Sequence, residues 1–375
     1  MSRRYRLAAA LAICALLVTL LVAGLHPRTT TGTALPRPGV ALARPGTCGP
    51  LLASMDIRHR VAQLVVVGVD PTDPAAAVKL VHDEQVGGIF IGGNATQLLK
   101  DGALNAVHDA SDLPLSVAVD EEGGRVQRID DLDGSVPSAR ELAATKTPAE
   151  VHDLAVSRGG QLRARGVTVD FAPDTDVTDA PDDTVIGDRS FSPDPARVKT
   201  YAMAFASGLR DAGIEPVLKH FPGHGHASGD SHKGLVRTPP LAQLRTSDLV
   251  PYQELADYGP VAVMVGHLDV PDLTNGAAAS LSPAAYQLLR GDFGFAGPIL
   301  TDDLGAMRAI TEQYSLPDAV LKALQAGADQ ALWSSGGHTN EVLDRLVRAV
   351  GSGELPESRV QESAKRVLAA KNACA

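Results

Sequence analysis

Residues 196–220 read ARVKTYAMAFASGLRDAGIEPVLKH and hold the pattern that decides the fold. Residues 196–212 place apolar side chains at the spacing of one helical face, and residues 215–220 hold a short apolar stretch that ends in a lysine and a histidine. The first segment predicts an amphipathic helix and the second a strand buried on both faces. A helix followed by a buried strand is the repeating unit of a parallel sheet.

The same unit recurs along the chain. Amphipathic stretches such as residues 75–83 and 150–165 alternate with short aliphatic, β-branched runs. The strand candidates are Val61–Val69, Val86–Gly92, Leu115–Asp120, Val167–Ala172, Glu215–His220, Val261–His267, Pro298–Asp302 and Asp329–Ser334. Eight such units predict an α/β fold, a single-domain (β/α)8 TIM barrel. An open doubly wound sheet is the alternative, but no GxGxxG follows the first run and no GxxxxGK[ST] occurs.

Composition limits the class of protein. The chain has 375 residues, of which 44% are hydrophobic and 21% charged, and this balance is typical of one large globular domain. Its formal net charge is −10. Because affinity for nucleic acid comes mostly from neutralising phosphates, this charge argues against a nucleic-acid partner.

The N-terminus has the features of an export segment. Residues 1–6 read MSRRYR, and residues 7–25 are uncharged and mostly aliphatic. We therefore expect residues 1–25 to be a signal peptide or membrane anchor, residues 26–49 a flexible linker, and residues 50–375 the catalytic domain. The expected location is extracytoplasmic, either secreted or anchored to the outer face of the cytoplasmic membrane. If the N-terminal segment is an anchor, it would tether the protein to the membrane.

Two cysteines lie beyond the export segment, at opposite ends of the expected domain. A closed barrel brings its two ends together, and an oxidising compartment favours disulfides. We expect a disulfide between Cys48 and Cys374. Two free or separately packed thiols are the alternative, because a disulfide needs Cα atoms within about 7 Å.

Polar residues end several of the expected strands. In a (β/α)8 barrel the carboxyl ends of the strands surround the active site, so charged side chains at these places predict a functional site. The residues in question are Asp120, Lys219, His220, His267, Asp302, Asp303 and Trp333.

The segment from His220 to His232 contains four of the chain's 11 histidines. One hypothesis is a zinc site, because clustered imidazoles and a carboxylate are suitable ligands. The other is acid/base catalysis by a dyad in which Asp230 orients the imidazole of His232. Gly223, Gly225 and Gly229 indicate a flexible loop, which favours the dyad over a metal cage.

Several motifs together resemble the bacterial β-N-acetylglucosaminidases of glycoside hydrolase family 3. They are VDEEGGRVQR ending at Arg128, IGDRSF at Ile186–Phe191, KHFPGHG followed by DSH, and TDDLGAM at Thr301–Met307. The resemblance extends from about Met55 to Lys371. The chain departs from the family at Gly225-His226-Ala227, where GDT often follows the second histidine's position.

The resemblance implies a role for each matching residue. Asp302 matches the nucleophile that forms a glycosyl-enzyme intermediate, and Asp303 is the competing choice. His232 matches the acid/base residue and Asp230 its partner. The residues that would bind the sugar are Asp120, Arg128, Arg189, Lys219 and His220.

Other polar residues near these motifs are given lesser roles. Glu121 and Glu122 are assigned to the loop fold or to the support of sugar-binding residues, and His224 to the loop itself. His267 can reach the site or be a hydrogen-bonded core residue. Core packing is the expected role of Trp333, and stacking on a sugar is the alternative.

The expected function is that of a retaining exo-β-N-acetylglucosaminidase that removes terminal GlcNAc from peptidoglycan-derived fragments during cell-wall turnover. The resemblance implies no metal and no organic cofactor. The expected partner is a saccharide, namely GlcNAc-containing muropeptides, and the expected state is a monomer. Two alternatives stay open: a metal-dependent hydrolase that uses the cluster from His220 to His232, and a non-catalytic exported sugar-binding protein.

Overall fold

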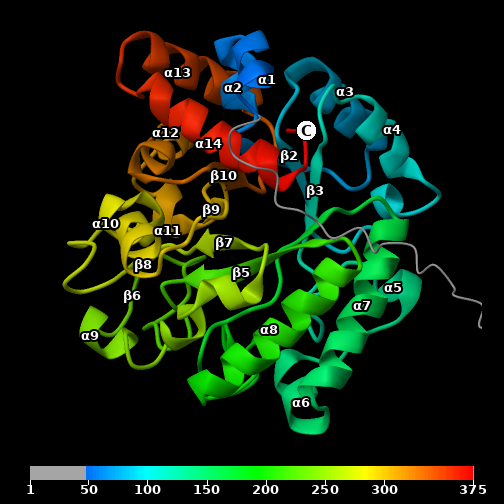
Figure 1. The fold of residues 1–375 in the computed structure, drawn as a ribbon, viewed down its shortest axis with the longest axis vertical. Helices are drawn as coiled ribbons and strands as arrows, with labels where there is room; N and C mark the ends of the chain where they lie inside the picture. The colour runs from blue at the N-terminus through cyan, green and yellow to red at the C-terminus, as the bar shows by residue number, and fades with distance from the viewer. Residues whose placement is uncertain (1–47, 375) are drawn as a thin grey trace, which may run out of the picture. The chain divides into compact units, whose positions relative to one another are not determined.

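The computed structural model describes residues 48–374 (Figure 1). The expected export segment, residues 1–25, and most of the expected linker lie outside the described residues. Cys48 is buried and Gly49 begins the first helix, so residues 48 and 49 belong to the folded body and not to a linker.

A closed barrel of parallel strands forms the centre of the described part, which confirms the predicted (β/α)8 fold. Neighbouring strands follow the order β1-β10-β9-β7-β5-β4-β3-β2 around the barrel. Their bounds are β1 Val65–Val69, β2 Gly88–Ile91, β3 Ser116–Val119, β4 Val169–Asp170, β5 Glu215–Phe221, β7 Ala262–Val265, β9 Ile299–Asp303 and β10 Gln330–Trp333. Each lies within or overlaps one of the predicted runs.

Helices surround the barrel (Figure 1). The α-helices are α1 Gly49–Ser54, α2 Ile57–Ala62, α3 Pro74–Glu84, α4 Ala103–Asp109, α5 Asp130–Asp133, α6 Ala139–Thr145, α7 Pro148–Ala164, α8 Pro195–Asp211, α9 Leu241–Leu244, α10 Pro283–Gln287, α11 Arg308–Thr311, α12 Leu316–Ala326, α13 Thr339–Gly351 and α14 Glu357–Ala370. Short 3₁₀ segments are η1 Gln97–Leu99, η2 Gly187–Arg189, η3 Val250–Tyr252, η4 Leu255–Tyr258 and η5 Ala279–Leu281, and η6 Leu288–Asp292 is a π-helix.

Local sequence explains where the longer helices begin. Thr147 caps α7 through a capping box with Glu150, and Pro148 occupies the first turn, where a missing N–H costs nothing. Asp194 caps α8 by accepting a hydrogen bond from the backbone N–H of Ala196. The two helices pack side by side against one flank of the barrel (Figure 1).

Two hydrophobic layers hold the barrel together. Alternate strand residues point inward and fill its interior, where the rings of Phe90 and Phe171 stack with centroids 5.4 Å apart. The opposite strand faces pack against the helices in a much larger core. This alternation is why the strands read as continuous apolar runs.

The first predicted strand begins too early. Val61 and Ala62 end helix α2, and the strand starts only at Val65. The reason is local, because the side chain of Asp56 accepts a hydrogen bond from the N–H of His59 and starts a helix that continues into the apolar run.

Sequence analysis also missed a second, two-stranded parallel sheet. It consists of β6, Val236–Arg237, and β8, Leu268–Asp269, and it lies outside the barrel. Strands this short carry no periodic signal, and their pairing depends on the loops that bring them together.

The two ends of the described chain meet. Cys48 and Cys374 form a disulfide, with Cα atoms 4.8 Å apart across 326 residues of sequence. Within residues 48–374, none of the helices combines the length and the apolar character that a membrane span requires.

Candidate active site

Two adjacent carboxylates end strand β9, at the mouth of the barrel. Both are buried, so burial alone does not distinguish them. Asp303 accepts hydrogen bonds at one oxygen from the N–H groups of Gly305 (2.8 Å), Ala306 (3.2 Å) and Ser334 (3.0 Å). Its other oxygen accepts from the hydroxyl of Ser334. Asp303 therefore fixes the loop after β9.

Asp302 has a different environment. One oxygen accepts a hydrogen bond from the N–H of Asp303 at 2.8 Å, and the other accepts none from residues 48–374. Burial by itself raises the pKa of Asp302, but the positive charge of His220 and the Asp303 N–H outweigh it and hold the pKa below its ordinary value. Asp302 is therefore an anion at neutral pH with one oxygen available for attack.

The sugar-binding candidates form one ionic cluster. Nζ of Lys219 lies 2.7 Å from Oδ1 of Asp120 and 2.5 Å from Oε1 of Glu122. Arg189 donates to both oxygens of Glu122, at 2.8 Å each, and Nη2 of Arg128 lies 3.5 Å from Oδ2 of Asp120. The structure thus brings Asp120, Arg128, Arg189 and Lys219 together. Glu122 links Lys219 to Arg189, and Asp120 links Lys219 to Arg128.

The charges of this cluster stabilise one another. Burial alone lowers the pKa of Lys219, but Asp120 and Glu122 outweigh it and raise the pKa above its ordinary value. Burial alone raises the pKa of Glu122, but Arg189 and Lys219 outweigh it and leave the pKa lowered. The cluster therefore presents fixed donors and acceptors, as recognition of sugar hydroxyls requires.

Asp174 and Asp176 contact two of the candidate site residues and were not predicted from the sequence. Nδ1 of His220 lies 2.7 Å from Oδ2 of Asp176, and Oδ2 of Asp174 lies 3.4 Å from Nη2 of Arg189. Burial alone lowers the pKa of His220, but Asp176 outweighs it and raises the pKa. The signal in the sequence is FAPDTD, residues 171–176, where two aspartates follow the fourth strand just as polar residues follow other strands.

The Asp230–His232 dyad is present on the loop between β5 and β6. Oδ1 of Asp230 accepts hydrogen bonds from the backbone N–H of His232 and lies 3.0 Å from its Nδ1. The side chain of His232 is 62% exposed, whereas that of Asp230 is 20% exposed. A carboxylate on Nδ1 leaves Nε2 of the imidazole free to exchange a proton.

The other histidines of this segment have separate partners. His226 pairs with the buried carboxylate of Asp248 through Nδ1, at 2.9 Å, and the N–H of His224 donates to Asp176. Among the described residues, the atoms close enough to share a metal ion come from Asp174, Asp176 and His220. The four imidazoles from His220 to His232 therefore do not converge on one point.

Two further residues, His267 and Trp333, are structural. His267 is fully buried, with Nε2 donating to the carbonyl of Asp303 at 2.8 Å and Nδ1 lying 2.7 Å from the hydroxyl of Ser280. Trp333 is 0% exposed and donates to the carbonyl of Gly337, so it packs in the core and is closed to a sugar.

Glu121 also belongs to the loop fold. Its carboxylate accepts hydrogen bonds from the side chain of Arg158 and from the N–H groups of Arg128 and Ile129.

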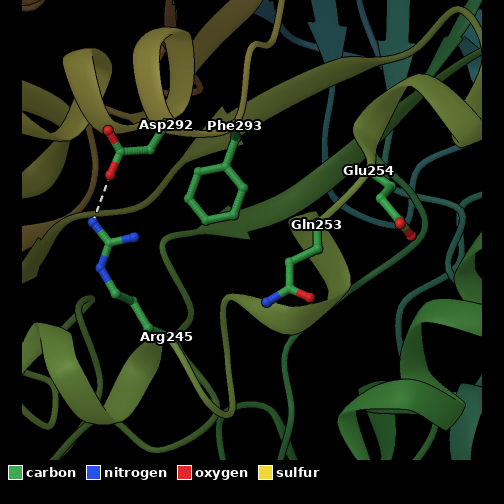
Figure 2. A pocket seen from close by; sticks show the side chains of 5 residues that line it. All are labelled: Arg245, Gln253, Glu254, Asp292 and Phe293. Atoms are coloured by element: carbon green, nitrogen blue, oxygen red, sulfur yellow. Dashed lines mark hydrogen bonds and ion pairs between the residues drawn. The ribbon is translucent and has the colours of Figure 1, made fainter.

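A surface cavity of about 300 Å³ lies elsewhere on the molecule. Figure 2 shows its lining residues, Arg245, Gln253, Glu254, Asp292 and Phe293, with Arg245 and Asp292 paired at 2.6 Å. None of the site residues predicted from sequence lines it. Catalytic chemistry is therefore to be sought at the mouth of the barrel, where those residues gather.

Comparisons with known proteins show the family to which the chain belongs. Residues 56–370 match the Glycosyl hydrolase family 3 N terminal domain. Over 376 residues the chain is 52% identical to the Beta-hexosaminidase LpqI of Mycobacterium tuberculosis, covering 96% of each chain. It is 34% identical to the Beta-hexosaminidase of Xylella fastidiosa over 76% of this chain and 87% of that relative.

Solved structures show the same fold. A family 3 glycosyl hydrolase of Mycobacterium smegmatis superposes with a TM-score of 0.83 at 57% identity, covering 85% of this chain and 98% of that one. A family 3 β-N-acetylglucosaminidase of Paenibacillus sp. FPU-7 gives a TM-score of 0.78 at 32% identity, covering 85% of this chain and 62% of that one. The chain described here belongs to glycoside hydrolase family 3 and is a β-N-acetylhexosaminidase of that family.

Proposed function

We propose that the protein is a retaining exo-β-N-acetylglucosaminidase and that Asp302 is its nucleophile. The observation that carries the proposal is the contrast between two neighbouring carboxylates. Asp303 is saturated by four hydrogen bonds from its own loop and from Ser334, whereas Asp302 keeps one oxygen without a protein partner. A lowered pKa keeps Asp302 ionised, as attack on an anomeric carbon requires.

The Asp230–His232 dyad supplies the proton in this proposal. In the first step Nε2 of His232 protonates the glycosidic oxygen while Asp302 attacks C1 and the C1–O bond breaks. In the second step the neutral imidazole takes a proton from water, which attacks C1 and releases Asp302. Asp230 stabilises the imidazolium and fixes the tautomer at each stage. His232 is exposed, so the loop must carry it over the bound sugar.

The ionic cluster at the mouth supports recognition of a terminal sugar. Asp120 is the least enclosed carboxylate of the cluster and is held by Lys219 and Arg128. In our proposal it accepts hydrogen bonds from the hydroxyls farthest from the scissile bond, while Arg189, Lys219 and His220 bind the same ring. In our proposal the ionic cluster lies against the far end of the ring, so that a non-reducing terminal residue is the one removed.

The substrate we propose is a peptidoglycan-derived fragment with terminal GlcNAc, cleaved outside the cytoplasm during cell-wall turnover. An extracytoplasmic location of the protein is supported by the Cys48–Cys374 disulfide and by the basic and apolar N-terminus of the sequence. We further propose that the protein is secreted or anchored to the outer face of the cytoplasmic membrane and that it acts as a monomer.

The test is hydrolysis of a GlcNAc-MurNAc fragment and of a chromogenic β-GlcNAc glycoside, with NMR of the first product. We expect release of GlcNAc as the β-anomer and trapping of a fluorinated GlcNAc on Asp302, seen by mass spectrometry. First release of the α-anomer would overturn the covalent mechanism. Equal or faster turnover of the matching glucoside would overturn the amino-sugar assignment.

One observation favours a metal-dependent hydrolase as a second candidate. Ligating atoms of Asp174, Asp176 and His220 lie within 4.8 Å of one another. These atoms already serve the Asp176–His220 hydrogen bond at 2.7 Å, however. We expect a chelator to leave hydrolysis unchanged, and activity lost with chelator and restored by zinc would favour the metal-dependent enzyme instead. Saccharide binding without turnover, unaffected by Asp302→Asn, would indicate a non-catalytic sugar-binding protein.

A further inference from the structure

The dyad loop, residues 222–235, carries its catalytic imidazole in an exposed position. His232 is 62% exposed, and Asp230, with which it forms hydrogen bonds, belongs to the same loop. Most of residues 226–235 are exposed, so this part of the loop gains little order from burial and its position depends on how it is anchored. General acid catalysis requires that position to be accurate, because a misplacement of about 1 Å can cost about a hundredfold in rate.

The C-terminal end of the loop is anchored by a buried carboxylate. Strand β6 pairs with β8, and Nε of Arg237 lies 2.8 Å from Oδ2 of Asp269. The other oxygen of Asp269 accepts hydrogen bonds from the hydroxyl of Thr274 and the N–H of Gly276, both at 3.0 Å. Asp269 therefore joins the dyad loop to the loop after β7, one oxygen serving each.

The same arginine closes the loop on itself. The N–H of Ser228 donates to the carbonyl of Arg237 at 2.8 Å, and the N–H of Arg237 donates to the hydroxyl of Ser228 at 3.1 Å. This pair of hydrogen bonds makes residues 228–237 a ring that contains Asp230 and His232. Whatever holds Arg237 therefore also holds the dyad.

A third contact lies beside the dyad itself. The carbonyl of Ser231 accepts a hydrogen bond from the N–H of Ala309 at 3.3 Å, and its hydroxyl lies 3.7 Å from the sulfur of Met307. Met307 and Ala309 follow the strand that carries Asp302. This contact sets the dyad beside the nucleophile's loop, and the Arg237–Asp269 pair fixes the opposite end of the ring.

We infer that Arg237 and Asp269 are positioning residues for the acid/base step. They touch no substrate, and they act by holding the ring of residues 228–237 so that His232 meets the glycosidic oxygen. The inference rests on the proposed role of His232. The side chain of Arg237 is 66% exposed whereas that of Asp269 is 6% exposed, so removing the arginine loosens the ring and leaves Thr274 and Gly276 held.

The test compares leaving groups in Arg237→Ala. The ratio kcat/KM covers only the steps up to formation of the glycosyl-enzyme, in which the acid protonates the departing oxygen. We expect kcat/KM for the unactivated disaccharide GlcNAc-β-1,4-GlcNAc to fall about tenfold or more. A 2,4-dinitrophenyl β-GlcNAc glycoside needs little protonation, so its kcat/KM should stay within about twofold. Arg237→Lys should recover part of the loss.

Three variants make the result decisive. Arg245→Ala removes another exposed arginine that is paired with an aspartate, Asp292, at the cavity of Figure 2, and it should leave kcat/KM for both substrates unchanged. Ser228→Ala loosens the ring from its other side and should reproduce the leaving-group pattern, which covers the case of a poorly folding Arg237→Ala. His232→Ala should show the same pattern more strongly.

The outcomes separate this inference from the proposed function. If His232→Ala shows the leaving-group pattern and both Arg237→Ala and Ser228→Ala behave as wild type, the positioning role is overturned and the acid/base role stands. An equal loss on both substrates for the two ring variants, with a lowered melting temperature, would assign them a merely structural role. If His232→Ala lacks the pattern, the proposed acid/base residue is wrong.

Discussion

Asp302 and Asp303 are adjacent in sequence, yet their side chains have different hydrogen-bond partners. The two side chains have the same chemistry, adjacent places in one strand and similar burial. Successive side chains of a strand point to opposite faces. Asp303 accepts hydrogen bonds from N–H groups of its own loop, whereas Asp302 keeps one oxygen without a hydrogen bond from residues 48–374. The charge of one is used in loop structure, and the charge of the other is available for chemistry.

Alanine at each position should give opposite results. We expect Asp302→Ala to reduce turnover of every substrate to background while its melting temperature stays equal to wild type or rises, because a buried functional carboxylate is removed. Asp303→Ala should lower the free energy of unfolding by about 2–5 kcal/mol, because several buried N–H groups lose their acceptor. Thermal unfolding and an aryl glycoside assay measure both effects. If the Asp303→Ala variant were stable and the Asp302→Ala variant unfolded, the structural role would belong to Asp302 and not to Asp303.

The Asp176–His220 pair predicts a pH dependence of stability. Burial by itself raises the pKa of Asp176, but His220 outweighs it and lowers the pKa to about 2, from 3.8 in an unfolded chain. The ionised aspartate therefore contributes stability above about pH 4, and the contribution is lost as the pH falls toward 2. The pKa of His220 is raised above 6.5, so its contribution is complete below that pH and is lost as the pH rises through the folded-state value.

Asp176→Asn should therefore be most destabilising between about pH 4 and pH 6.5. We expect a loss of about 3–5 kcal/mol in that window, the usual effect of breaking a buried ion pair. The difference from wild type should shrink at pH 2.5, where wild type has lost much of the same contribution. Urea unfolding of both proteins at pH 2.5, 5 and 8 measures this difference in the free energy of unfolding. A difference that does not vary with pH would contradict the ionic account.

At the scale of elements, strand ends have different functions on the two faces of the barrel. Carboxyl ends carry Lys219, His220 and Asp302, which gather at the mouth. At the opposite face, Asp329 precedes β10 and is fully buried. This arrangement separates residues for chemistry from residues for stability.

Asp329 gives a prediction for that opposite face. Its carboxylate contacts Arg290 at 2.5 Å, Arg366 at 3.1 Å and Arg359 at 3.3 Å, and it accepts from the hydroxyl of Ser363 at 3.0 Å. We expect Asp329→Ala to cost about 3–5 kcal/mol, because three cations lose their shared partner. KM and kcat per folded molecule should stay unchanged, as measured by active-site titration. A changed KM with normal stability would contradict this division of roles.

The whole molecule is closed at its ends by the Cys48–Cys374 disulfide. The bond joins the residue before α1 to the segment after α14, and Nζ of Lys371 donates to the carbonyl of Gly87 at the start of β2. The closure therefore lies on the face where the strands begin, away from the mouth.

Loss of this disulfide should affect stability and spare catalysis. We expect the double variant Cys48→Ser/Cys374→Ser to lose about 2–5 kcal/mol, because its unfolded chain is no longer closed into a large loop. Melting curves with and without reductant measure the effect. Wild type should respond to reductant and the double variant should not. A wild type that melts at the same temperature in both conditions would show that the bond contributes nothing.

Much of the fold was predictable because strand and helix patterns are local. Eight buried runs separated by amphipathic segments follow from side-chain order alone, and so do the barrel and the polar residues at its mouth. The predicted start of the first strand was wrong because Asp56 caps helix α2, and this helix continues into the apolar run before β1 begins. The small sheet of β6 and β8 was missed because two-residue strands have no period.

The order of residues was enough to predict which chemical groups are present: the TDD carboxylates, the DSH dyad and the charged residues that end the strands. The folded chain was needed to show which aspartate has an unpaired oxygen, that Glu122 links Lys219 to Arg189, and that Asp176 pairs with His220. The difference arises from the distance along the chain over which the interactions act. Residue type and local periodicity are written along the chain, but the direction of a side chain and its hydrogen-bond partners depend on atoms from distant segments.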